Sequence, residues 1–180
     1  ILCPTDFSKH AMNAAQYACA LADKLNSALI LFHTYESPAD FTQGQFTITT
    51  NTEDLLKSAA SKNLSALRQK LKNKFPRVKL ETMLETGAGY SEILSAANKQ
   101  NVDLIVMGST GTNKLERLLM GSTASRVLQH ATCPVLCIPK DAEFNDIKKI
   151  VFATDLKDDN ILSATKLVPF AAAFGAEIVF

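Results

Sequence analysis

Short, continuously apolar segments recur along this chain, and they restrict its fold more than any other feature. Residues 28–33 read ALILFH and residues 102–107 read VDLIVM. A strand with one face in water alternates apolar and polar residues, whereas a strand covered on both faces is apolar almost throughout. These runs therefore predict strands of a parallel sheet with helices on both of its faces.

Segments with helical spacing separate the apolar runs. Between Ser8 and Asn26 apolar residues recur every three or four positions, and Ser8 is suited to cap the start of that helix. Five strands that alternate with four helices are typical of a doubly wound α/β fold. The predicted strands are 1–4, 28–33, 78–84, 102–107 and 135–138; further helices are predicted at 56–75, around 93–97 and at 122–130; and a loop is predicted at 35–51. In the third strand, Val78, Leu80, Thr82 and Leu84 are expected on one side.

The chain repeats its own beginning at a fixed offset of 149 residues. Residues 1–7 (ILCPTDF) align without gaps with residues 150–156 (IVFATDL), where Ala153 replaces Pro4. A strand, a Thr-Asp pair, a helix and a second strand recur in order, which favours a whole-domain repeat over chance similarity of two βαβ units. We therefore predict a domain at 1–140, a linker at 141–146 and the start (β-α-β) of a similar domain at 147–180. One such unit cannot bury both faces of its sheet, so either the rest of a second domain exists or the unit packs on something else. Of the two, we expect a longer tandem parent protein.

Composition and charge argue against several classes of protein. Nineteen basic and eighteen acidic residues leave a net charge of +1, which does not suggest the basic face of a nucleic-acid binder. No apolar run approaches the roughly 20 residues of a membrane helix, and no signal peptide is evident, so we expect a cytoplasmic protein. Cys133 and Cys137 fit one side of a core strand, and neither cysteines nor histidines have metal-binding spacing, so no metal site is predicted.

A glycine pattern follows the fourth predicted strand. Gly108, Gly111 and Gly121 form Gly-x2-Gly-x9-Gly-Ser, which ends with Ser122 at the start of a helix. Glycines let the backbone approach a ligand closely, and a helix N-terminus attracts phosphate. The pattern is neither a Walker A motif nor a Rossmann fingerprint. It favours a site for a nucleoside polyphosphate, with turns and caps as the alternative use of the glycines.

This loop, together with PTDFS at 4–8 and LFH at 31–33, resembles the ATP-binding branch of the universal stress protein family. The resemblance covers residues 1 to about 139, and again about 147–180 as the start of a second domain. It implies the strand order 3-2-1-4-5, bound ATP with Mg²⁺, and association of two such domains, within one chain or as a homodimer through the fifth strand. The implied nucleotide-binding residues are Pro4, Thr5 and Thr34 around adenine, Asp6 at the nucleoside, and Met107, Gly108, Gly111, Gly121, Ser122 and Thr123, with Ser109 beside them, at ribose and phosphates.

That strand order supplies a physical argument for the same place. It reverses between the first and fourth strands, and ligands of such sheets bind at the carboxyl ends that flank the reversal. Asp6 could there accept hydrogen bonds from ribose hydroxyls or an adenine N–H, or it could instead cap the following helix. Lys114 and Arg117 could reach phosphates or simply be solvated. We predict a structural role for His33.

We therefore predict an ATP-binding stress-response or regulatory protein. No pair of nucleophile and base is evident, so no catalytic residue is assigned. One alternative is a slow ATP hydrolase or adenylyl-transferring enzyme that uses the same pocket. The other is a protein-interaction module that binds no nucleotide.

Overall fold

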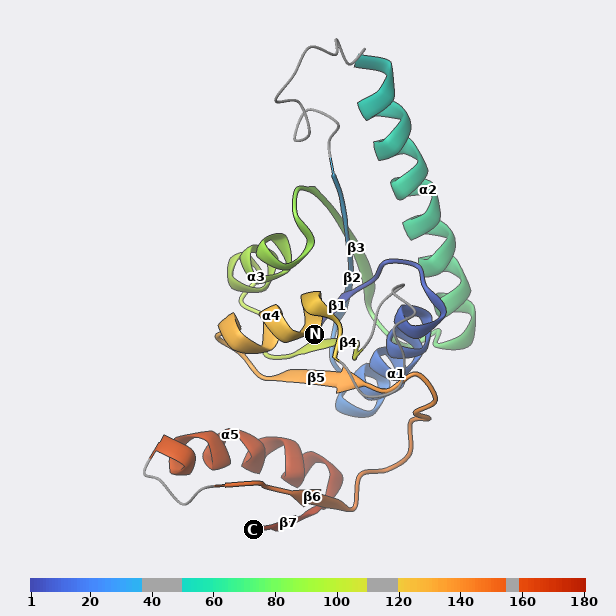
Figure 1. The fold of residues 1–180 in the computed structure, drawn as a ribbon. Helices are drawn as coiled ribbons and strands as arrows, with labels where there is room; N and C mark the ends of the chain where they lie inside the picture. Colours follow the sequence, from blue (N-terminus) through green and yellow to red (C-terminus); the bar gives the residue numbers. More distant parts are fainter. Residues whose placement is uncertain (37–49, 110–119, 155–158) are drawn as a thin grey trace. The chain divides into compact units, whose positions relative to one another are not determined.

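A computed structural model of the chain describes residues 1–36, 50–109, 120–154 and 159–180 (Figure 1). The chain divides into two compact units, Ile1–Ala142 and Glu143–Phe180. The first unit contains β1 (Leu2–Pro4), α1 (Lys9–Leu25), β2 (Leu29–Tyr35), α2 (Thr50–Lys74), β3 (Leu80–Thr86), α3 (Gly89–Lys99), β4 (Ile105–Gly108), α4 (Ser122–His130) and β5 (Val135–Ile138). The second unit contains β6 (Lys149–Val151), α5 (Asp159–Phe174) and β7 (Glu177–Val179).

The first unit is a doubly wound α/β fold, as predicted. Its five strands are all parallel and lie in the order β3-β2-β1-β4-β5. Helices α1 and α2 lie on one face of the sheet, and α3 and α4 lie on the other (Figure 1). The apolar runs form β1, β2 and β4, the three central strands, because only these strands are covered on both faces and flanked on both edges.

The pleat of the central strands divides the core between the two helical layers. Leu2, Phe32 and Ile105 belong to a buried cluster with residues of α3 and α4. Their buried neighbours Cys3 and Leu31 point to the opposite face, because successive side chains alternate across a strand. The α3/α4 cluster consists of Leu2, Phe32, Ile93, Ala96, Ala97, Ile105, Met107, Ala124 and Val127.

Helix α1 begins and ends as its sequence predicts. The side chain of Ser8, the N-cap, accepts a hydrogen bond of 3.1 Å from the backbone N–H of Ala11. Asn26 closes the helix in the left-handed conformation that asparagine adopts readily. Between these caps Ala14, Ala15 and Ala18 are fully buried, so small side chains let α1 pack closely against the sheet.

Two predicted boundaries were wrong at the segment 35–51. Strand β2 continues to Tyr35, which pairs with Thr86 of β3, so the pairing extends beyond the apolar run. Helix α2 already begins at Thr50, ahead of the predicted start at residue 56. Residues 52–59 are all exposed, so no apolar period marks this part of the helix. The remainder of the predicted loop, 37–49, lies outside the described residues.

The third and fourth strands also differ from the prediction. Strand β3 starts at Leu80, and Thr82 is exposed while Met83 is half-buried, so the expected single apolar side is not maintained. This strand is at the edge of the sheet, where the burial of alternate residues is least strict. Strand β4 starts at Ile105, three residues later than predicted, and includes Gly108.

All four cysteines are free thiols. Cys3 and Cys19 are buried, and burial raises the pKa of the Cys3 thiol and raises that of Cys19 to about 12. Cys133 and Cys137 are half-buried against the α3/α4 cluster, but Cys133 precedes β5, so the two do not share a strand as predicted. In the described part of the chain, no cluster of three His, Cys, Asp or Glu side chains could hold a metal, and no helix could cross a membrane.

Candidate functional site

The carboxyl ends of β1 and β4 are neighbours in the sheet, and the strand order reverses between them. Leu2 pairs with Ile105, so Pro4 at the end of β1 is level with Met107 near the end of β4. In open α/β sheets such a reversal leaves a crevice, because the connections leave the two strands in opposite directions. The structure therefore places the predicted site residues of both strands together along the carboxyl ends of the strands, which we call the carboxyl edge of the sheet.

Two hydrogen bonds of Ser109 fix the end of β4, and one of them joins the two halves of the glycine motif. The N–H of Ser109 donates to the carbonyl oxygen of Ile138 at 3.0 Å, which continues the β4–β5 pairing. The N–H of Gly121 donates to the carbonyl oxygen of Ser109 at 2.9 Å, so the start of α4 lies directly beside the end of β4. Gly111, Lys114 and Arg117 belong to residues 110–119, outside the described residues.

The N-terminus of α4 has the features of an anion site. Gly121 is its N-cap, with φ −60° and ψ 148°, and has no side chain that could cap the first turn. Ser122 and Thr123 follow it and are exposed. The backbone N–H groups of a first helical turn have no partner within the helix, and with the helix dipole they favour a negatively charged ligand.

The turn between β1 and α1 is held by side chains that accept hydrogen bonds from backbone N–H groups. Thr5 is buried, with 7% of its surface exposed, and its Oγ1 accepts from the N–H of Phe7 at 3.1 Å. Oδ1 of Asp6 accepts from the N–H of Ser8 at 2.9 Å. Asp6 thus supports the turn, while Ser8 caps the helix. The Asp6 carboxylate is exposed, beside the end of β1.

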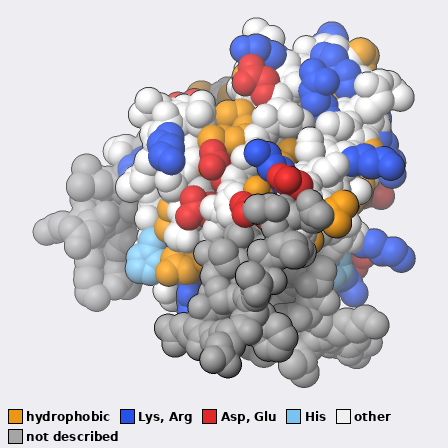
Figure 2. Space-filling model, turned by 90° about the horizontal axis from the view of Figure 1, so that it is seen from above, with side chains coloured by type: hydrophobic (Ala, Val, Ile, Leu, Met, Phe, Trp, Pro, Cys, Tyr) orange, Lys and Arg blue, Asp and Glu red, His pale blue; other side chains and the backbone are white. Residues whose placement is uncertain are grey.

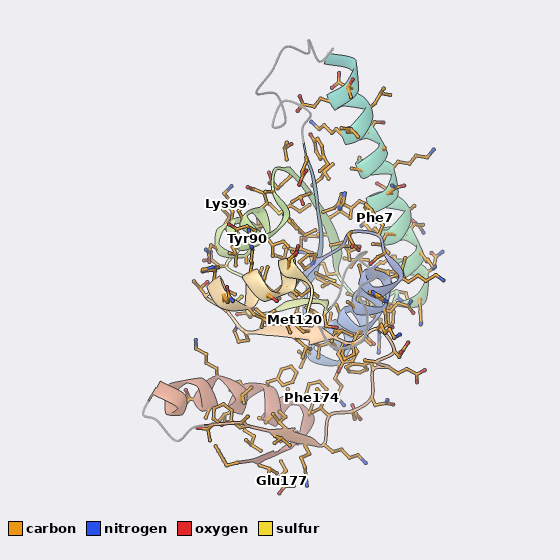
Figure 3. All side chains as sticks on the ribbon, in the orientation of Figure 1. Phe7, Tyr90, Lys99, Met120, Phe174 and Glu177 are labelled. Atoms are coloured by element: carbon orange, nitrogen blue, oxygen red, sulfur yellow. The ribbon has the colours of Figure 1, made fainter. Side chains whose placement is uncertain are left out.

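Thr34 lies inside β2 rather than just beyond it, and it faces the start of α3. A Cβ added to Gly89 would lie 3.9 Å from Oγ1 of Thr34, so the first residue of α3 approaches this hydroxyl. The guanidinium of Arg126 lies over the ring of Tyr90, 4.7 Å from its centroid, and this contact joins α4 to α3. Tyr90 and Met120, which precedes α4, are labelled in Figure 3.

Met107 differs from the other predicted residues. Only 5% of its surface is exposed, and its side chain belongs to the α3/α4 cluster. The Met107 side chain is therefore part of the core. The predicted residues that the structure gathers at the carboxyl edge are Pro4, Thr5, Asp6, Thr34, Gly108, Ser109, Gly121, Ser122 and Thr123; we refer to them as the carboxyl-edge site.

Two further residues belong to this edge and were not assigned to the site from sequence. Phe7 has a φ of 60°, and its ring lies 4.4 Å from that of His33, measured between centroids. Nδ1 of His33 lies 2.7 Å from the carbonyl oxygen of Thr5. Neither periodicity nor motif spacing reports a left-handed backbone or a bond between two strands, so the sequence carries no signal for this arrangement. On the face of the molecule that Figure 2 presents, Lys and Arg side chains are interspersed with acidic, hydrophobic and uncharged ones.

Comparison with known proteins gives consistent results. Residues 1–139 match the universal stress protein family. A universal stress protein of Methanocaldococcus jannaschii is 33% identical over 146 residues, which cover 78% of this chain and 81% of that protein. The solved structure of the universal stress protein UspA from Lactobacillus plantarum has a TM-score of 0.64 and 26% identity, and covers 76% of this chain and 94% of that chain. A universal stress protein from Archaeoglobus fulgidus, described in complex with dAMP, shares the fold at 18% identity and a TM-score of 0.56, over 76% of this chain and 94% of that chain.

Proposed function

This chain belongs to the universal stress protein family, and on that premise we propose that its first unit is a regulatory protein that binds ATP at the carboxyl-edge site. The observation that carries the proposal is the bond from Gly121 to Ser109, which sets the N-terminus of α4 beside the sheet reversal. Backbone donors for phosphate and an exposed carboxylate for ribose then lie at the same edge.

Each part of the nucleotide has a proposed set of partners. The phosphates bind the first turn of α4, with the hydroxyls of Ser122 and Thr123 and with Gly111. The Asp6 carboxylate binds the ribose. One of its oxygens accepts a hydrogen bond from the N–H of Ser8, which orients the carboxylate, and the side chain remains exposed to a ligand. The adenine lies against Pro4, Thr5 and Thr34. Gly108, Ser109 and the backbone of Met107 lie between the ribose and the phosphates and contact both.

An adenine nucleotide is supported by the relative from Archaeoglobus fulgidus, which is described with dAMP and shares this fold. The triphosphate is supported by the helix N-terminus, which favours a larger negative charge. Mg²⁺ would arrive with the nucleotide and be held mainly by phosphate oxygens and water, as this cation prefers. That fits a site where the described residues offer no metal-binding cluster of their own.

We propose binding with at most slow turnover. Hydrolysis at an ordinary rate needs a base or nucleophile positioned at the phosphates. The carboxylate of the carboxyl-edge site, Asp6, is assigned to the ribose and accepts a hydrogen bond from Ser8, so this proposal places no base at the phosphates. With saturating Mg-ATP, we expect phosphate and pyrophosphate release far below the roughly 10 per second of a typical enzyme. A coupled phosphate assay, with pyrophosphatase added to convert pyrophosphate to phosphate, measures this. Release at several per second would favour the hydrolase or adenylyl-transfer alternative.

We further propose that the second unit is the start of a second domain of the same type. Its backbone supports this, because pairs in the two units correspond at the offset of 149 residues. Leu2 pairs with Ile30 in the first unit, and Val151 pairs with Val179 in the second. In both units the two paired strands are parallel, and one helix connects them: α1 between β1 and β2, and α5 between β6 and β7.

The end of the helix between the paired strands supports the same proposal. Ser27 donates its N–H to the carbonyl oxygen of Ala22 at 2.9 Å, and Ala176 donates to that of Ala171 at 2.9 Å. Asn26 has a φ of 51°, and its counterpart Gly175 has a φ of 61°. The same helix end, with the same left-handed residue, thus closes both α1 and α5.

The burial of corresponding residues indicates what the second unit lacks. Leu2 is fully buried between β2 and β4, whereas Val151 is 73% exposed. Strand β6 pairs only with β7 among the described strands, and Phe180 is also largely exposed. We propose that a strand equivalent to β4, from a complete second domain, covers the free edge of β6. A homodimer in which two copies meet through β5 is the alternative partnership.

A further inference from the structure

We infer that His33 is a positioning residue of the carboxyl-edge site: it holds the turn between β1 and α1 in the conformation that presents Asp6. The inference rests on the proposed nucleotide binding and adds a residue from β2 to it. His33 does not act through contact with the ligand. It acts on the backbone directly before Asp6, through Thr5 and Phe7.

The turn contains a backbone conformation that needs support. In the described part of the chain, three non-glycine residues have a positive φ: Phe7, Asn26 and Asn101. Asparagine adopts this left-handed region readily, but for a bulky side chain such as phenylalanine it is an outlier. Conformations of this kind persist where surrounding contacts determine them, and they concentrate at ligand-binding positions.

Two contacts fix Phe7. Its N–H donates to Oγ1 of the buried Thr5 at 3.1 Å. Its ring packs against the imidazole of His33, with 4.4 Å between the ring centroids and an interplanar angle of 49°. Figure 3 labels Phe7 beside the strands, where the chain leaves β1 for α1. Phe7 is therefore held from its own backbone and from the side chain of another strand.

His33 also fixes the residue before Asp6. Its Nδ1 lies 2.7 Å from the carbonyl oxygen of Thr5, and because a carbonyl oxygen only accepts, Nδ1 must carry the proton and donate. This assigns the neutral ring to the Nδ1–H tautomer. The N–H of Thr5 donates to the carbonyl oxygen of Phe32 in β2 at 2.8 Å. Thr5 is thus bonded to β2 through both its N–H and its carbonyl oxygen.

The consequence falls on Asp6. Its carboxylate is exposed, and it is bonded to the N–H of Ser8, so the orientation of the side chain follows that of the turn. A turn that is already ordered loses less conformational freedom when the ligand binds. Removing the His33 bond should therefore weaken nucleotide binding even though His33 makes no contact with the nucleotide.

The test compares three variants with the wild type. His33→Leu removes the donor and keeps the bulk, whereas His33→Asn keeps an N–H near the position of Nδ1. His130→Leu makes the same change at an exposed position at the end of α4 and serves as the control. Two quantities are measured: the dissociation constant for Mg-ATP, and the amide hydrogen exchange of Phe7 and Ser8 without nucleotide.

We expect H33L to bind Mg-ATP about tenfold more weakly, the effect of losing one well-formed hydrogen bond, and to exchange the amides of Phe7 and Ser8 faster. H33N should restore most of both quantities, and H130L should change neither. Rescue by H33N is what a role in general stability would not produce.

Unchanged exchange and affinity in H33L would overturn the inference, and so would an H33N variant as impaired as H33L. Failure of the wild type to bind Mg-ATP would overturn the proposed function instead. The exchange measurement, which needs no nucleotide, would then still decide whether His33 holds the turn: faster exchange in H33L supports it, and unchanged exchange refutes it.

Discussion

Replacing Gly121 with leucine is expected to weaken Mg-ATP binding by about 100-fold or more, equivalent to about 2.7 kcal/mol, while the fold persists. The backbone at Gly121 has φ −60° and ψ 148°, values that any residue adopts, so a side chain causes no backbone strain. Leucine is a poorer N-cap, at a cost of about 1 kcal/mol, which a folded domain tolerates. The loss of binding would come from a side chain placed where the phosphates should approach the first turn of α4.

Binding should be measured by titration and folding by circular dichroism. Gln129→Leu is a suitable control, because it adds the same side chain to the exposed last turn of the same helix. We expect it to bind Mg-ATP like the wild type. If G121L also bound like the wild type, the phosphates would have to lie elsewhere, and the assignment of the site to α4 would be wrong.

The matched substitutions Leu2→Ala and Val151→Ala are expected to differ strongly in their effect on the free energy of unfolding. Leu2 is fully buried on a central strand, so its truncation should cost about 3 kcal/mol. Val151 occupies the corresponding position of the second unit and is 73% exposed, so V151A should cost less than about 0.5 kcal/mol. Urea denaturation of the 180-residue chain measures both.

The same pair tests the proposed second domain. In a chain that carries that domain in full, Val151 should be covered as Leu2 is, and V151A should then cost about 1–3 kcal/mol. Equal costs of L2A and V151A in the 180-residue chain would contradict the proposal. Such a result would mean that Val151 is already buried in the 180-residue chain, without any further strand beside β6.

Much of the fold could be predicted from the sequence, because burial on both faces determines the residue types of the central strands. The runs at residues 28–33 and 102–107 predicted β2 and β4, and the bounds of α4 and β5 agree with the prediction. Prediction failed where burial is weak. The exposed start of α2 has no apolar period, and at the edge strand β3 the expected alternation ends at Thr82.

The candidate site could be proposed from the sequence to the extent that local motifs mark its residues. The glycine pattern and Asp6 were identified because they match a family motif at the ends of predicted strands, although glycine also serves turns and aspartate also caps helices. For His33 the sequence predicted a structural role, but not its bond to Thr5 or its packing on Phe7, since these contacts depend on the strand order and on the unusual φ of Phe7. A bond between residues 28 positions apart is set by tertiary structure, and no local pattern in the chain encodes it.

Calorimetric titration of the purified chain with Mg-ATP, with AMP and GTP as controls, tests the central claim most directly. We predict a dissociation constant on the order of micromolar for ATP, about −8 kcal/mol, and weaker binding of GTP and of AMP. The preference over AMP would reflect phosphates at α4, and the preference over GTP would reflect the adenine contacts. Absence of binding by a folded, nucleotide-free sample would contradict the claim and favour a protein-interaction module.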